Sequence, residues 1–315
     1  MKAPSTRGGL RWNELWSLVK ETATDWNDHN AARLAAALAC YTLLSIAPLV
    51  VLSVAVAGLA FGDQAARGEI SAQIGAVVGA DAAHAVEAIV VNAKTPSSGI
   101  IGTVFGIVVL LFGASGVFGE LESALNTIWG VAPKPGRGWK GLVMDRFFSF
   151  TMVIAVAFLL LVSLVMSAAL AATGKFFSSS LPGGDALWQV VNFIVALGIT
   201  TLLFGIVFKY VPAAKIDWRD VWLGAVVTAV LFGVGKLLLG LYIGRSSITS
   251  AYGAAGSLVA LVIWVYYTSQ IVFMGAEFTQ VHARRSGRRV QPADNAVAVE
   301  PPSPAKPVAG PPRQA

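Results

Sequence analysis

Charged residues are what this sequence has least of. Asp, Glu, Lys and Arg make up 13% of its 315 residues, against about 25% in an ordinary globular chain, while 56% of the residues are hydrophobic. A soluble protein of this length needs charged side chains to cover its core, and here the apolar runs are too long for that. We therefore expect most of the chain to be surrounded by lipid.

Cysteine and histidine are also scarce, and their scarcity excludes several kinds of site. The single cysteine, Cys40, lies inside an apolar run, so neither an intramolecular disulfide nor a cysteine metal cluster can form. The three histidines, His29, His84 and His282, are far apart and belong to no metal-binding spacing. The sequence also has no Walker loop and no GxGxxG opening a soluble βαβ unit. We therefore expect no metal, no cofactor and no enzymatic activity.

Six apolar runs are long enough to cross a bilayer as helices, for which roughly 20 residues suffice. The chain is predicted to be all-α, with one polytopic membrane domain over residues 34–280. The six spans are expected at 34–61, 99–119, 144–172, 186–210, 220–243 and 254–280, with a short exterior helical segment at 62–98. Residues 281–315 are basic and rich in Pro and Ala, and we expect a disordered cytoplasmic tail there.

Basic residues are distributed unevenly between the two sides of this arrangement. With the N-terminus inside, 18 of the 23 Lys and Arg residues fall in interior segments and 4 in exterior segments. The positive-inside rule then predicts that both termini are cytoplasmic. The same bias explains the net charge of +6, so the charge does not indicate nucleic-acid binding.

Residues 1–33 precede the first span and are predicted to hold an amphipathic helix. Apolar residues recur at helical spacing, namely Leu10, Trp12, Leu15, Trp16, Val19, Ala23 and Trp26. Such a helix can lie in the headgroup layer with its tryptophans at the interface. It can equally pack against the protein's own loops, and the sequence leaves both interpretations open.

Proline and glycine mark where the spans are expected to bend or to approach one another. Pro48 removes a backbone donor within the first span and should kink it, either as a packing feature or as part of a gate. Glycines allow close helix contact. The glycines that we expect at such contacts are Gly113, Gly116, Gly119, Gly233, Gly240, Gly253 and Gly256.

Lys236 is a candidate substrate-binding residue because it lies well inside the predicted fifth span. The other residues on its helical face are small: Ala225, Ala229, Gly233 and Gly240. The ammonium can contact an anionic substrate there, or it can extend to the outer headgroups.

The sixth span carries a polar stripe. Tyr266, Gln270 and Glu277 share one helical face, which should point at protein or water and adds three candidate substrate-binding residues. Glu277 has a structural alternative, as a cap or in an ion pair with Arg33 or with the Arg284 region.

Several segments resemble the YihY/BrkB family of bacterial inner-membrane proteins. They are AALACYTLLSIAPL (36–49), LFGASGVFGELESALNTIWGV (111–131), DWRDVWLGAVVTAVLFGVGKLLLGLYIG (217–244), and YGAAGSLVALVIWVYY with GAEFTQVHA in the sixth span. This family carries a ribonuclease label, a virulence and serum-resistance label, and a proposed role in envelope lipid export.

The resemblance implies an inner-membrane protein of the cell envelope. It would be a transporter or flippase-like carrier, with an anionic lipid as candidate substrate, or a non-transporting scaffold that maintains envelope integrity. Ribonuclease activity is not expected, because a metal-dependent nuclease needs converging carboxylates or histidines. Membrane lipids are the expected partners, nucleic acid is not, and a homo-oligomer is compatible with the sequence.

Overall fold

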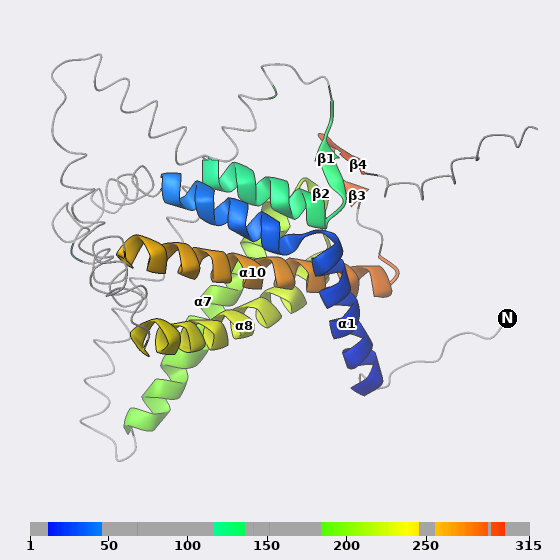
Figure 1. Cartoon of the computed structure of the whole chain (residues 1–315). Coiled ribbons are helices and arrows are strands. Elements are labelled where there is room, and N and C mark those ends of the chain that lie inside the picture. The colour runs from blue at the N-terminus through cyan, green and yellow to red at the C-terminus, as the bar shows by residue number, and fades with distance from the viewer. Residues whose placement is uncertain are drawn as a thin grey trace, which may run out of the picture.

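Three long helices lie at the centre of the structure (Figure 1). The computed structural model describes residues 12–45, 68, 116–135, 141, 151, 184–245, 256–288 and 291–299. In these residues α8 (Trp218–Arg245) packs against both α7 (Gly184–Tyr210) and α10 (Gly256–Arg285). Each of the three contains a segment long and apolar enough to cross a membrane: Trp188–Tyr210, Trp218–Leu239 and Val259–Arg285.

These helices coincide within a few residues with the last three predicted spans. The first three predicted spans, the exterior segment 62–98, Pro48, Gly113 and Gly253 lie wholly or largely outside the described residues. The number of six spans therefore stays a prediction.

Two shorter helices lie side by side, on the side of α10 opposite α8 (Figure 1). One is the apolar helix Ala31–Ser45, and the other covers residues 116–128, nine residues past the predicted end of the second span at 119. They meet at Gly116, where an added Cβ would lie 3.4 Å from Ser45 Oγ and 3.6 Å from Tyr41 Cδ1. Gly116 therefore lies where these two helices approach each other.

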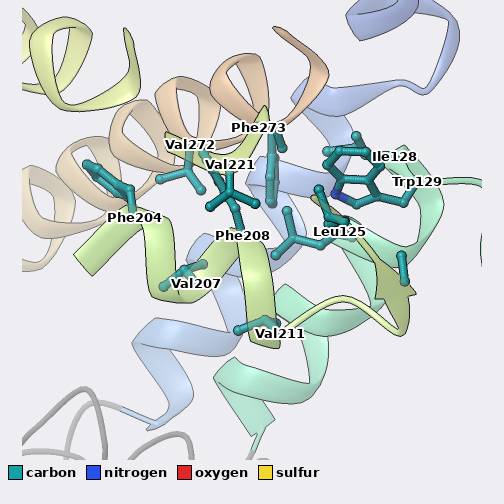
Figure 2. Packing of buried hydrophobic residues seen from close by; sticks show 14 of the residues in the cluster. Leu125, Ile128, Trp129, Phe204, Val207, Phe208, Val211, Val221, Val272 and Phe273 are labelled. Atoms are coloured by element: carbon teal, nitrogen blue, oxygen red, sulfur yellow. The ribbon is translucent and has the colours of Figure 1, made fainter. Parts of the chain in front are cut away.

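One hydrophobic cluster joins all five of these helices (Figure 2). The two short helices contribute small and aliphatic side chains such as Ala35 and Leu125, and the three long helices contribute Phe208, Val221 and Phe273. The side chains of Leu125, Phe208, Val221 and Phe273 are completely buried. The described helices thus share a packed interior, while α8 turns many leucines and valines outward.

The contact between α8 and α10 is closest where two glycines face two threonines. Thr279 lies against Gly224, and Thr228 lies against Gly275. Each threonine hydroxyl donates a hydrogen bond to the carbonyl four residues earlier on its own helix, Thr228 to Gly224 and Thr279 to Gly275. Two Gly-x-x-x-Thr segments therefore interlock across the helix pair, and their hydroxyls are satisfied without a partner on the other helix.

Helix α1 (Trp12–Asp28) crosses α10 steeply near the C-terminal end of α10 (Figure 1). Leu18 and Thr22 are buried, whereas Trp12 and Trp16 are 80% and 66% exposed. The helix stops at Asp28, and Asn30, with φ of 52°, turns the chain into Ala31–Ser45. The helix that the sequence predicted is therefore present, with Trp12 and Trp16 on its open side. Trp26 instead packs against the hydrophobic cluster.

The segment after α10 is ordered where the sequence predicted disorder. β3 (Gln291–Pro292) pairs antiparallel with β2 (Ala214–Lys215), and β4 (Ala296–Ala298) pairs antiparallel with β1 (Val131–Pro133). The prediction was wrong for residues 291–299. It rested on the Pro- and Ala-rich composition, which indicates only that the segment cannot form a hydrophobic core of its own. Backbone hydrogen bonds to two loops need no such core.

Hydrogen bonds at helix ends fix where α8 begins and where α10 ends. The Asp217 carboxylate accepts a hydrogen bond from the Arg219 backbone N–H at 3.0 Å, which makes Asp217 the cap of α8. Gly287, with φ of 73°, ends α10, and the Arg288 N–H reaches the Ala283 carbonyl at 3.1 Å. This turn sends the chain back toward β2 and β1.

Candidate functional site

Ion pairs concentrate at one end of the helix bundle, which we call the polar end. We define it by α1, the loops that carry β1 and β2, the N-terminal turn of α8, the last two turns of α10 and residues 286–288 and 291–299. The strand pairs and the α1–α10 contact show that all these parts lie at the same end. By the positive-inside argument, this end is expected to be cytoplasmic.

The most deeply buried polar contact at this end joins α10 to the residue that follows α1. His29 Nδ1 lies 2.7 Å from Glu277 Oε1, and Glu277 is completely buried. The hydrogen bond to Glu277 raises the pKa of His29 above its ordinary value, although partial burial opposes this. The second oxygen of Glu277, Oε2, is buried and has no hydrogen-bond partner within the described residues. His29, not Arg33 or the Arg284 region, is therefore the partner of this carboxyl group.

A second set of ion pairs fastens α1 to the C-terminal end of α10. Arg284 pairs with Glu21 and, at 2.8 Å, with Asp25, while Arg285 Nε donates to Glu21 at 2.6 Å. Arg285 also donates to the Ser17 hydroxyl at 2.8 Å. Burial opposes ionisation of Glu21, but the two guanidinium groups prevail and hold its pKa below the usual range. One side of α1 is thus acidic and faces a basic helix end.

A third ion pair ties the C-terminal segment to α8. Asp220 is 1% exposed and accepts two hydrogen bonds from Arg288, from Nε at 2.8 Å and from Nη2 at 2.5 Å. His282 Nε2 lies 3.7 Å from the same carboxylate. A cavity of about 340 Å³ opens beside this pair, and its lining includes Lys215, Asp217 and Gln291.

The structure does not bring Lys236 to Glu277. Lys236 is exposed on α8, beside Gly235, which faces Tyr267 and Ile271 of α10. Glu277 lies level with the first turns of α8, where Thr279 meets Gly224. The two charged residues are thus separated by roughly 15 Å along the helix, at about 1.5 Å per residue.

The other two predicted residues of α10 are both partly buried. Tyr266 packs at the edge of the hydrophobic cluster, and Gln270 is half-buried. Along the helix axis, Tyr266 and Gln270 lie near the level of Lys236, whereas Glu277 does not. Gly233 is exposed, and an added Cβ there would meet no described atom within 4 Å.

Sequence reasoning missed the pairs His29–Glu277 and Asp220–Arg288, because each joins segments far apart in the chain. The Gly-x-x-x-Thr segments of α8 and α10 are visible in the sequence and could have been found by their spacing. Within the described residues no group of three or more His, Cys, Asp or Glu side chains could hold a metal ion.

Long apolar helices, an outward-facing aliphatic surface and ion pairs gathered at one end define an integral membrane protein. The chain belongs to the family described as Virulence factor BrkB, whose model matches residues 22–299. The matched region includes β3 and β4, so the paired C-terminal segment lies within the part of the chain that the family model covers.

Several relatives carry membrane-protein names. A UPF0761 membrane protein of Ralstonia nicotianae is 29% identical over 187 residues, which cover 59% of this chain and 39% of the relative. One of Rhodospirillum centenum is 28% identical over 261 residues, covering 81% of this chain and 54% of the relative. The chain thus spans only part of the length of these relatives.

A relative of similar length carries a different name. The putative ribonuclease-like protein YfkH of Bacillus subtilis is 22% identical over 273 residues, covering 85% of this chain and 96% of that protein. No solved structure matches the chain.

Proposed function

We propose that this protein is a flippase-like carrier of the bacterial inner membrane, with both termini cytoplasmic and an anionic lipid as its substrate. The observation that carries the proposal is the position of Lys236. It is exposed on α8 among exposed aliphatic side chains, of which Val234, Leu237 and Leu238 are its neighbours. A cation on an apolar, membrane-facing surface is costly, roughly 2.5–3.5 kcal/mol at a helix centre, and such residues commonly mark a path for charged groups.

Two further features support this assignment. Tyr266 and Gln270 of α10 lie near the level of Lys236, so two further polar side chains occur at a similar depth of the helix pair. The ion pairs of the polar end hold α1, α8 and α10 together on one side. A carrier needs such a closure on the side opposite to the one from which the substrate enters.

The test uses purified protein in liposomes that contain fluorescent phosphatidylglycerol or fluorescent phosphatidylcholine. Wild-type protein should make inner-leaflet phosphatidylglycerol accessible to an external quencher faster than protein-free vesicles do. Lys236→Met should lose this activity, and Lys236→Arg should keep part of it, because the charge is what binds the headgroup. Leu237→Met, one residue away on the exposed surface, is the matched control and should behave as wild type. Full activity of Lys236→Met would remove this residue from the substrate path.

A non-transporting scaffold is the second candidate, and the interlocked threonines and glycines of α8 and α10 favour it. Such a contact fixes two helices rigidly against each other. A scaffold predicts no lipid movement by wild-type protein in the same liposomes. It also predicts that Lys236→Met fully complements the envelope defect of a strain that lacks the protein.

We also propose a role without enzymatic chemistry. Phosphodiester cleavage assisted by metal ions would need a set of carboxylates or histidines around the metal. Purified protein incubated with RNA and Mg²⁺ or Mn²⁺ should leave the RNA intact. Cleavage that co-purifies with the membrane protein and disappears in a Glu277→Gln or Asp220→Asn variant would overturn this part of the proposal.

A further inference from the structure

In the contact between His29 and Glu277, the imidazole is accessible to solvent and the carboxyl group is not. The side chain of His29 is 31% exposed and that of Glu277 is 0% exposed. Nδ1 and Oε1 are 2.7 Å apart, close enough to share a proton. A proton can therefore enter from the aqueous side through His29 and be held at a buried carboxyl group.

The charge of this pair changes with a single proton. With one proton the pair is neutral overall, either as an imidazolium with a carboxylate or as two neutral groups. Without it, a carboxylate remains in a buried position with one oxygen, Oε2, lacking a partner among the described residues. An uncompensated buried charge is strongly unfavourable, so loss of the proton should weaken the arrangement that buries Glu277.

Charged residues near the pair also affect its protonation. Asp25 and Asp28 on α1 act on His29 and favour its protonated form. Asp25 also acts on Glu277, and Arg284 of α10 offsets part of the negative charge there. These are the charged groups that act on the pair from α1 and α10 in the described part of the chain, and on balance they favour the protonated pair.

We propose that His29 and Glu277 form a proton-binding site that fastens α1 to α10. Binding of one proton stabilises the docked position of α1, and release of that proton loosens it. The site does not depend on which substrate, if any, the protein carries.

The direction of the pH dependence follows from the pKa of His29. Contact with Glu277 raises this pKa above the ordinary 6.5, so the docked state binds the proton more tightly than the undocked state. The stabilisation is complete below the undocked pKa and is lost as pH rises through the docked pKa. Between these two values the docking equilibrium constant should fall about tenfold per pH unit.

The ion pairs of Glu21 with Arg284 and Arg285 also hold α1 on α10. Glu21 has a lowered pKa, so it is ionised throughout, and guanidinium groups keep their charge. The ion pairs of Arg284 and Arg285 therefore supply a constant attachment. His282 is the other histidine in the described part of the chain, and its Nε2 lies 3.7 Å from Asp220. It makes a suitable control because its partner is on α8.

The experiment measures the distance between α1 and α8 in the full chain reconstituted in nanodiscs. Spin labels replace the exposed residues Lys20 and Arg219 in a Cys40→Ser background, and the distance distribution is recorded between pH 5.5 and 8.5. A single docked population is expected at the acid end. A second population should grow as the pH rises.

Variants separate the proton site from other causes. Glu277→Gln imitates the protonated carboxyl group and should stay docked at every pH. His29→Gln removes the imidazole that shares the proton with Glu277 and should show a smaller docked fraction with a pH profile that differs from that of the wild type, while His282→Gln should keep the wild-type profile. A wild-type distance distribution that does not change with pH, or a Glu277→Gln profile that follows the wild type, would overturn the proposal. Should a variant not fold, the pH dependence of the wild-type thermal midpoint still decides: it must fall as pH rises above 6.5.

Discussion

Thr279 of α10 occupies the space that a side chain at Gly224 of α8 would need. A Cβ added at Gly224 would lie 1.7 Å from Thr279 Oγ1, and one added at Gly275 would lie 1.8 Å from Thr228 Oγ1. Distances this short leave room for a hydrogen atom and for nothing larger. The two helices are therefore at the closest approach that their backbones permit.

Substitution of either glycine should force α8 and α10 apart. We expect Gly224→Ala or Gly275→Ala to lower stability by about 1–3 kcal/mol or more, the usual cost of overpacking. The measurement is the thermal unfolding midpoint in detergent micelles. Gly198→Ala on α7 is the control, because no atom lies within 4 Å of its added Cβ. It should be neutral or stabilising, since Ala favours helix over Gly. Equal midpoints for Gly224→Ala and wild type would mean that the crossing is looser than described.

Arg288→Ala should detach the C-terminal segment and leave the buried Asp220 carboxylate without its main partner. The expected loss is on the order of 1–3 kcal/mol, less than the roughly 3–5 of a fully buried pair because the Arg288 side chain is 38% exposed. Residues after Gly287 should also become more sensitive to protease.

Lys215→Ala is the control for this pair. Lys215 pairs with Asp294 at 2.6 Å, but both side chains are largely exposed, and such pairs contribute little. Stability close to wild type is expected for Lys215→Ala. If Arg288→Ala behaves in the same way, the buried position of Asp220 does not depend on Arg288.

Trp12 and Trp16 should contact lipid headgroups. Both are more than half exposed on the side of α1 that faces away from α10, as a helix lying in the interface requires. Brominated lipids should quench less of the tryptophan fluorescence after replacement of both residues by Ser. Replacement of the buried Trp129 by Phe should leave the lipid-dependent fraction unchanged. Unaltered quenching in the Trp12 and Trp16 variant would indicate that these rings pack against protein.

Reporter fusions test the predicted topology. Fusions after residues 30, 135, 215 and 290 should report a cytoplasmic position, and fusions after 80, 180 and 248 an exterior one. Positions 30, 135 and 215 lie at the polar end, where the strand pairs and α1 meet, and the fourth position directly precedes β3 in the chain. They must therefore agree with one another whatever the orientation. Disagreement among them would contradict the fold, whereas a shared exterior position would contradict only the orientation.

The helices could be predicted from the sequence because lipid imposes a simple rule on them. A span must be long, apolar and hydrogen-bonded within itself, and α7, α8 and α10 show this in their composition alone. The start of α8 is likewise a local feature, because Asp217 caps the helix by accepting the Arg219 N–H.

The contacts at the polar end could not be predicted in the same way. His29 and Glu277 are separated by 248 residues, and nothing in the local sequence of either residue points to the other. The order in residues 291–299 was missed for a related reason. The strands at Ala214 and Val131 lie on distant loops that only the assembled helices bring near the tail. The sequence of the tail therefore does not indicate that it pairs with them.

The pairing of β3 and β4 with β2 and β1 sets an order of events during biosynthesis. Residues 291–298 leave the ribosome after every predicted span. The strands β1 and β2 therefore have no partner strand until the last helix is in place. Closing the polar end is then the final step of assembly, and it reports that α10 has been inserted in the correct direction. A chain interrupted after Arg288 would hold all its predicted membrane helices and still lack this closing step, because β1 and β2 would have no strand to pair with.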